Sequence, residues 1–117
     1  MENGSAPVSI SEVERYVMIN LRGRSTGLPM NIWIGPKGGA RHGPRIKVQM
    51  NHRQRFDLKN LAVVNTAIDP EVSEGRLSAE DLELVQRYIK LNFRAIMAHW
   101  REETDGVELA QALRPLA

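Results

Sequence analysis

The sequence contains no cysteine, and this absence excludes several classes of protein at once. A disulfide framework, a thiolate zinc site and a cysteine nucleophile all need the thiol that the chain lacks. A chain of 117 residues is nevertheless long enough to bury a core without such cross-links. The sequence therefore predicts one domain that is held together by its own apolar side chains.

Histidine is scarce as well, because His42, His52 and His99 are the only imidazoles in the sequence. No two of them have the i, i+4 spacing that places two ligands on one face of a helix, and no thiol accompanies them. We therefore expect no metal site and no cofactor.

Long apolar runs are missing too, and no segment approaches the roughly 18 apolar residues that a membrane span needs. The first ten residues, MENGSAPVSI, are acidic and polar and contain no apolar h-region, which argues against a signal peptide. The expected location is the cytoplasm, with no membrane contact.

Acidic residues are rare in the first half of the chain. Residues 1–60 hold ten Lys and Arg against four acids, residues 61–117 hold six against ten, and the net charge is +2. This separation favours an anionic partner for the basic half. The alternative is that the two halves pair their charges across the folded surface, where single pairs are weak.

Glycine and proline, in contrast, are concentrated in the stretch GPKGGARHGPRIKV at 35–48. Glycines let backbone N–H groups approach an anion, and Lys37, Arg41, Arg45 and Lys47 supply positive charge. The stretch does not match the P-loop pattern G-x-x-x-x-G-K-[ST], so nucleotide hydrolysis is not predicted. The simpler interpretation, a glycine-rich connection between two strands, stays open.

Alternating segments predict strands on both sides of this stretch, MNIWIG at 30–35 and RIKVQM at 45–50. In the second segment Arg45, Lys47 and Gln49 share one face, which we expect to be solvated and basic. A third strand is predicted within residues 53–68, and residues 69–76 are expected to form the loop that leaves the sheet.

One long helix is predicted to follow, with Ser78 as its N-cap and Gly106 as its left-handed C-cap. About 25 residues would make it roughly 38 Å long. Its principal apolar stripe should face the sheet, and consists of Leu82, Val85, Ile89, Phe93, Ile96 and Trp100. A second stripe, which includes Leu84 and Leu91, needs another cover, either the N-terminal segment, which we favour, or a second subunit.

Polar side chains lie at the seam between the two stripes, namely Tyr88, Asn92 and His99. Covered polar groups have to be hydrogen-bonded. They form either a polar site between sheet and helix or a set of structural ties, and the structural interpretation is favoured.

The N-terminal part is the least defined. Residues 1–8 are expected to be a flexible lead to a single domain at 9–117. Residues 11–22 fit a helix, because Ser11 and Glu14 make a capping-box pattern, and also fit a strand at YVMINL. The expected fold class is α+β: a three- or four-stranded antiparallel sheet with one long C-terminal helix packed on a face, and an additional N-terminal helix if the first interpretation holds.

Four segments together resemble the small bacterial family called domain of unknown function 4160: HGPRIKV, FDL, VSEGRLSAEDL and YIKLNFRAIMAHW. The resemblance covers roughly residues 30–102, and it includes the eight-residue spacing of Asn92 and Trp100. The family pattern Pro-His-x-His is replaced here by Pro44-Arg45-Ile46-Lys47. The resemblance implies no particular reaction. It implies a small protein partner, in an arrangement like that of a toxin–antitoxin pair.

The sequence therefore predicts a binding module for a protein partner or a nucleic-acid backbone, as a monomer or homodimer. Its basic strand–loop surface would consist of Lys37, Arg41, Arg45, Lys47, Arg53 and Arg55. The alternative is a metal-independent ribonuclease-type toxin in which His42 or His52 acts as the base. Whether the chain is an enzyme stays open.

Overall fold

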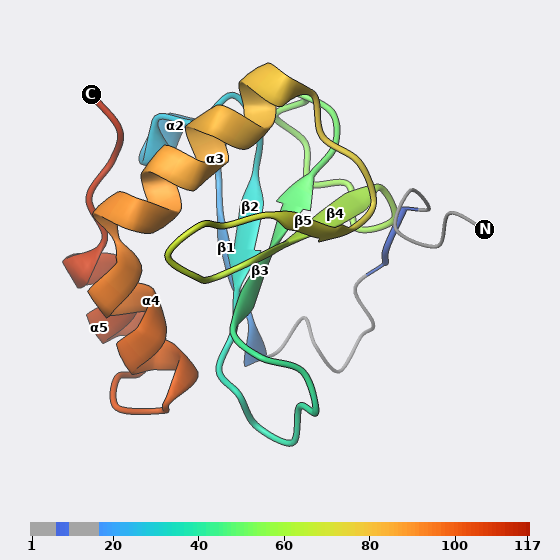
Figure 1. The fold of residues 1–117 in the computed structure, drawn as a ribbon. Coiled ribbons are helices and arrows are strands. Elements are labelled where there is room, and N and C mark those ends of the chain that lie inside the picture. Colours follow the sequence, from blue (N-terminus) through green and yellow to red (C-terminus); the bar gives the residue numbers. More distant parts are fainter. Residues whose placement is uncertain (1–6, 10–16) are drawn as a thin grey trace.

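A computed structural model describes residues 7–9 and 17–117, and within these residues five strands form one antiparallel sheet (Figure 1). The strands are β1 (Ile19–Leu21), β2 (Ile32–Ile34), β3 (Arg45–Gln49), β4 (Leu61–Asn65) and β5 (Val72–Glu74). Their order in the sheet is their order along the chain. The α+β class is confirmed, whereas the predicted count of three or four strands is wrong.

The two additional strands are short ones at the edges of the sheet. β1 lies within YVMINL, where a strand was the alternative to the favoured helix, and β5 lies in the predicted exit loop. Each has three residues, too few for an alternating pattern to stand out. The rest of the predicted N-terminal helix, residues 11–16, lies outside the described residues, as does most of the predicted lead. A short helix, α2 (Gly23–Thr26), follows β1.

One face of the sheet carries the main core. Its alternating β-branched side chains are fully buried against the helices. These include Ile32, Ile34, Ile46, Val48 and Val64. The helices on this face are α3 (Ala79–Leu91), α4 (Phe93–Trp100) and α5 (Gly106–Ala112). None of the helices in the described ranges is long and apolar enough to cross a membrane.

The predicted single long helix is wrong, because the chain turns at Asn92. Ser78 is the N-cap as expected, and its hydroxyl accepts the Asp81 N–H at 3.1 Å. At Asn92 the backbone leaves helical geometry (φ −111°, ψ 18°), and α4 departs at an angle from α3 (Figure 1). Gly106 is the first residue of α5 and not a C-cap, since Asp105 and Glu108 form a capping box around it.

Among the described residues, the C-terminal segment covers the second apolar stripe, and most of the N-terminal segment that the sequence favoured for this role lies outside them. α5 packs on α4 with Leu109 fully buried, and Leu113 and Leu116 contact the core cluster. The Leu116 N–H donates to the Thr26 carbonyl at 2.8 Å. The end of the chain thus closes the helical layer against the α2 turn.

The opposite face of the sheet is not solvated, contrary to the prediction for β3. Lys47 and Gln49 are 4% and 0% exposed. A second apolar cluster covers this face, formed by Trp33 and Leu61 with Val8, Met18, Phe56 and Leu58. Val8 reaches it through a backbone bridge to Leu61. Alternation separates two faces of a strand but does not reveal whether a loop will cover the second.

The loop after β3 provides that cover because polar side chains hold it in place. The Gln49 amide oxygen accepts the Asp57 N–H at 3.0 Å. Its amide nitrogen donates to the carbonyls of Arg53 and Arg55, at 3.0 and 3.2 Å. Asn31 donates to Gln49 and to the carbonyl of Arg53. A buried amide network therefore fixes residues 51–57 over the sheet.

Candidate anion-binding pocket

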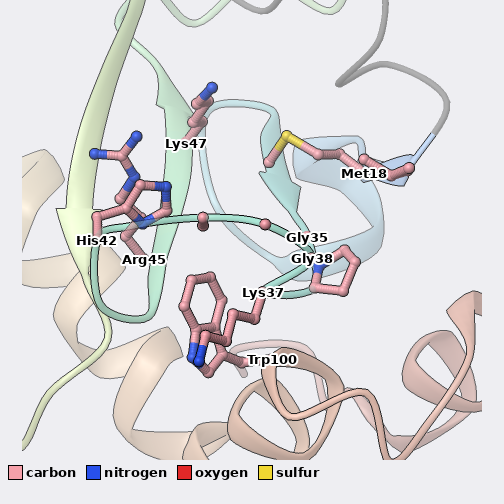
Figure 2. Close-up of a pocket in the computed structure, with 12 residues that line it drawn as sticks. Met18, Gly35, Lys37, Gly38, His42, Arg45, Lys47 and Trp100 are labelled. Atoms are coloured by element: carbon pink, nitrogen blue, oxygen red, sulfur yellow. The ribbon is translucent and has the colours of Figure 1, made fainter.

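A cavity of about 420 Å³ lies beneath the connection between β2 and β3, which we call the pocket loop (residues 35–44). Its walls come from three distant parts of the chain: the residues before β1, the pocket loop with β3, and the end of α4 (Figure 2). The described lining residues are Val17, Met18, Gly35, Pro36, Lys37, Gly38, Gly39, Ala40, His42, Arg45, Lys47 and Trp100.

Backbone hydrogen bonds fasten the pocket loop to the end of α4. The Lys37 N–H donates to the Trp100 carbonyl at 3.0 Å, and the Gly38 N–H donates to the Glu102 carboxylate at 3.2 Å. The Ala40 N–H closes a turn on the Lys37 carbonyl at 2.8 Å. Gly38 has a φ of +50°, a left-handed conformation that glycine adopts without strain. The loop is therefore anchored at one side of the cavity.

Apolar and aromatic side chains make much of the cavity wall. Trp100 is 8% exposed, and its ring lies 5.6 Å from the His42 ring at an interplanar angle of 38°. In Figure 2, Met18 lies across the cavity from His42. A Cβ on Gly35 would lie 3.0 Å from the Met18 side chain, so glycine at this position lets Met18 pack closely.

The charged side chains in the described lining of the cavity are all basic, and two carboxylates lie beside it, Glu74 on Arg45 and Glu102 on the Gly38 N–H. Among the described residues that line it, Lys37, Arg45 and Lys47 are basic and none is acidic. Lys37 is exposed, whereas Lys47 is almost wholly buried. The Arg45 guanidinium binds the Glu74 carboxylate at 2.8 Å, and the two side chains are 23% and 44% exposed. One nitrogen of Arg45 makes this bond, so the planar group keeps further N–H donors.

The tautomer of His42 follows from one contact. Its Nδ1 lies 2.8 Å from the Gly43 carbonyl oxygen, which can only accept a hydrogen bond. Nδ1 must therefore carry the hydrogen, and in the neutral ring Nε2 holds the lone pair. His42 itself is exposed at the rim of the cavity.

The sheet separates the predicted basic residues into two groups. Lys37, Arg41 and His42 belong to the pocket loop that precedes β3. His52, Arg53 and Arg55 belong to the loop that follows it. Five residues of strand place these loops at opposite ends of β3, roughly 13 Å apart at Arg45 and Gln49. The two histidines therefore lie in different loops, at opposite ends of β3, and the predicted basic residues are divided between these loops.

The second group has structural partners of its own. His52 Nε2 lies 2.8 Å from the Asp81 carboxylate at the start of α3. Arg53 and Arg55 extend exposed side chains, while their carbonyls bind Gln49. These contacts tie the loop to the fold and leave the two guanidinium groups at the surface.

The polar helix seam consists of structural ties. Asn92 donates to the Arg114 carbonyl at 2.9 Å and accepts the Arg114 N–H at 2.7 Å. His99 Nδ1 lies 3.0 Å from the Thr104 carbonyl, and its buried Nε2 has no hydrogen-bond partner among the described residues. Burial raises the pKa of Tyr88 from 10.0 to about 12, because the phenolate would lose its hydration. The three side chains do not line the cavity.

Sequence reasoning missed two walls of the cavity, Met18 and Trp100. Trp100 was assigned to the core stripe of the helix, which accounts for its low exposure but not for its contact with the pocket loop. The proximity of Lys37 to Arg45, in contrast, follows from a connection between adjacent antiparallel strands. In the part of the chain that the structure describes, no cluster of three or more His, Cys, Asp or Glu side chains could hold a metal ion.

Comparisons of the chain with protein-family models, with curated proteins and with solved structures found no match. The resemblance to domain of unknown function 4160 receives no support from them and stays a prediction. What the chain does has to be argued from the cavity and its chemistry.

Proposed function

We propose that this chain is a binding module that takes an anionic partner at the cavity beneath the pocket loop. One observation carries the proposal: the charged side chains among the described residues that line the cavity are all basic. An apolar wall with a few convergent polar groups is typical of ligand sites, and about 420 Å³ lies within their usual range. The resemblance described above adds a partnership like that of a toxin–antitoxin pair, as a bacterial protein of that family would have.

Arg45 is the most ordered of the cationic groups at this site. Its ion pair with Glu74 fixes the guanidinium at the rim, and a group that is already fixed loses less entropy when a ligand binds. Lys37, near the start of the pocket loop, contributes a second and exposed charge. Arg41, which is also exposed, lies four residues further along the same loop. An anion at the mouth of the cavity would therefore meet charge from both ends of the pocket loop.

The test compares two double variants that remove the same charge from opposite ends of β3. Lys37→Ala with Arg45→Ala should weaken binding of a fluorescein-labelled polyanion, such as polyphosphate or an oligonucleotide, about tenfold or more. Arg53→Ala with Arg55→Ala should weaken it about twofold or less, because those residues lie outside the cavity. The affinities are measured by anisotropy at several salt concentrations. Equal losses in both variants, or no polyanion binding by the wild type, would refute the proposal.

A ribonuclease-type activity is the second candidate, and the tautomer of His42 is the observation that favours it. Nε2 could take the proton of an RNA 2′-hydroxyl while the 2′-oxygen attacks phosphorus and the P–O5′ bond breaks, which gives a 2′,3′-cyclic phosphate and a 5′-hydroxyl that takes its proton from water. Arg45 could stabilise the charged transition state. RNA incubated with the protein and EDTA should then be cleaved. His42→Ala should abolish the cleavage, and His52→Ala should preserve it, because His52 lies at the far end of β3. Intact RNA after incubation with the wild type would exclude this candidate.

A further inference from the structure

We propose that the anionic partner is single-stranded nucleic acid, with one base inserted between Trp100 and Met18 and its phosphate at Lys37 and Arg45. This inference rests on the proposed function and names the chemical class of its ligand. The argument depends on the wall of the cavity, on its rim and on a neighbouring hollow.

The cavity wall suits a flat, partly apolar group. Trp100 and His42 present two rings whose centroids lie 5.6 Å apart, and Met18 lies across the cavity in Figure 2. Bases stack on aromatic side chains in a way that tolerates any sequence, since every base has a π face. A carboxylate or an inorganic phosphate would satisfy the cations but would leave this wall without a partner.

The rim suits a sugar–phosphate backbone. Lys37 lies in the pocket loop and Arg45 directly after it, and both line the cavity, so a phosphate at the rim would lie near positive charge while the base points inward. A Cβ built on Gly39 or on Gly43 would meet no atom within 4 Å. Space therefore remains above the loop for the ribose, where larger side chains would fill it.

A second hollow supports a polymer instead of a free nucleotide. It has a volume of about 460 Å³ and shares His42 and Arg45 with the first, and its lining includes Asn65, Ser73 and Glu74. Two hollows that meet at a cationic boundary have the arrangement that two successive nucleotides and the phosphate between them require. A duplex keeps its bases stacked inside and could not fill either hollow.

Tryptophan fluorescence gives a direct test, because the chain has two tryptophans and Trp33 lies in the other apolar cluster. In the full-length Trp33→Phe variant, checked for folding by circular dichroism, Trp100 is the only tryptophan. A ten-nucleotide oligo(U) should quench it and should bind about tenfold more tightly than an abasic oligomer with the same number of phosphates. If Trp33→Phe does not fold, anisotropy of the labelled oligomers with the wild-type protein gives the same comparison.

The outcomes separate the two proposals. Equal affinity for the base-bearing and abasic oligomers would overturn the inference and leave the anion-binding function standing. Tighter binding of polyglutamate than of oligo(U) would overturn it in favour of an acidic protein partner. Binding of no polyanion would overturn both.

Two variants probe the contacts themselves. Trp100→Phe keeps an aromatic ring in the core, so it should fold, and it should reduce the advantage of oligo(U) over the abasic oligomer without changing affinity for the latter. Lys37→Ala should weaken both oligomers alike and should lower the slope of log affinity against log salt by about 0.7. A Trp100→Phe variant with the full base-dependent advantage would contradict the stacking contact.

Discussion

Tyr88 shows how a single buried side chain makes the stability of this fold depend on pH. Its ring is 1% exposed within the main core, and burial raises its pKa from 10.0 to about 12. The phenol is neutral in the folded state at a pH where it ionises in the unfolded chain. The contribution of Tyr88 to folding stability is thus fully present below pH 10 and is lost as the pH rises from 10 to about 12.

We expect this loss to be roughly 2 to 3 kcal/mol of unfolding free energy. Tyr88→Phe keeps the ring and removes the ionisation, so its stability should fall less over the same pH interval. Urea unfolding of both proteins at pH 9 and pH 12 measures the difference and cancels the titration of lysines. Parallel pH profiles for wild type and variant would contradict the expected pKa shift.

Among the elements, β5 depends on a single glycine that sequence reasoning did not single out. Gly75 follows β5 with a φ of +77°, and a Cβ on it would lie 2.7 Å from the Ala62 Cα and 2.9 Å from the Leu61 carbonyl oxygen. Both contacts are with the backbone of the β4 region, which cannot move without disturbing the sheet. The edge strand reaches β4 only because residue 75 has no side chain.

Gly75→Ala should therefore destabilise the protein by about 2 kcal/mol or more, from backbone strain and steric overlap together. The matched control is Gly106→Ala, where a Cβ meets nothing within 4 Å and the residue is helical. This control should be neutral or should stabilise by up to about 1 kcal/mol. The urea midpoints of the two variants measure this difference in stability. A Gly75→Ala protein as stable as the control would refute the claim that β5 needs a residue without a side chain at position 75.

The elements differ in how far the sequence could predict them. β2, β3 and the Ser78 cap follow from alternation and capping chemistry, and the structure has them where expected. Gly106 was misassigned because glycine fits both the end and the start of a helix. The sequence does contain the pattern that predicts a helix start here, because Asp105 and Glu108 have the spacing of a capping box on either side of the glycine. The turn at Asn92 has no proline or glycine to mark it, and the bonds that the Asn92 side chain makes there are with Arg114, 22 residues away.

For the candidate site, the sequence could supply the cationic residues but not the cavity. Lys37 and Arg45 lie near the two ends of a predicted connection between adjacent strands, so the sequence alone could predict that they lie at the same end of the sheet. The position of the cavity wall could not be predicted in this way, because Trp100 reaches the pocket loop only after the chain has turned at Asn92. Met18 joins it through the pairing of β1 with β2. Such placements depend on contacts between distant residues, which no short pattern contains.

At the scale of the whole molecule, Asn92 connects the middle of the chain to its C-terminal segment. Its amide makes hydrogen bonds to the N–H and the carbonyl of Arg114 and to the Tyr88 carbonyl. Asn92→Ala removes all three and leaves partly buried backbone groups without partners. We expect a loss of about 2 to 3 kcal/mol in unfolding free energy.

The control for this change is Gln111→Ala, which shortens an exposed polar side chain in α5 and should alter stability by less than about 0.5 kcal/mol. Hydrogen exchange adds a local measurement, because the Arg114 amide should exchange faster in Asn92→Ala. An unchanged unfolding midpoint and an unchanged Arg114 exchange rate would show that the connection contributes nothing.

The hydrogen bond between Leu116 and Thr26 also bears on how the protein is made. Apart from the isolated bridge of Val8 to Leu61, the described strands pair with their neighbours in sequence, so a nascent chain can assemble them one after another as they emerge from the ribosome. The helical layer cannot be completed in this way. The Thr26 carbonyl receives its hydrogen bond from Leu116, which is synthesised 90 positions later. Until Leu116 has emerged, we expect part of the apolar surface of the helices to be accessible to chaperones and to other nascent chains.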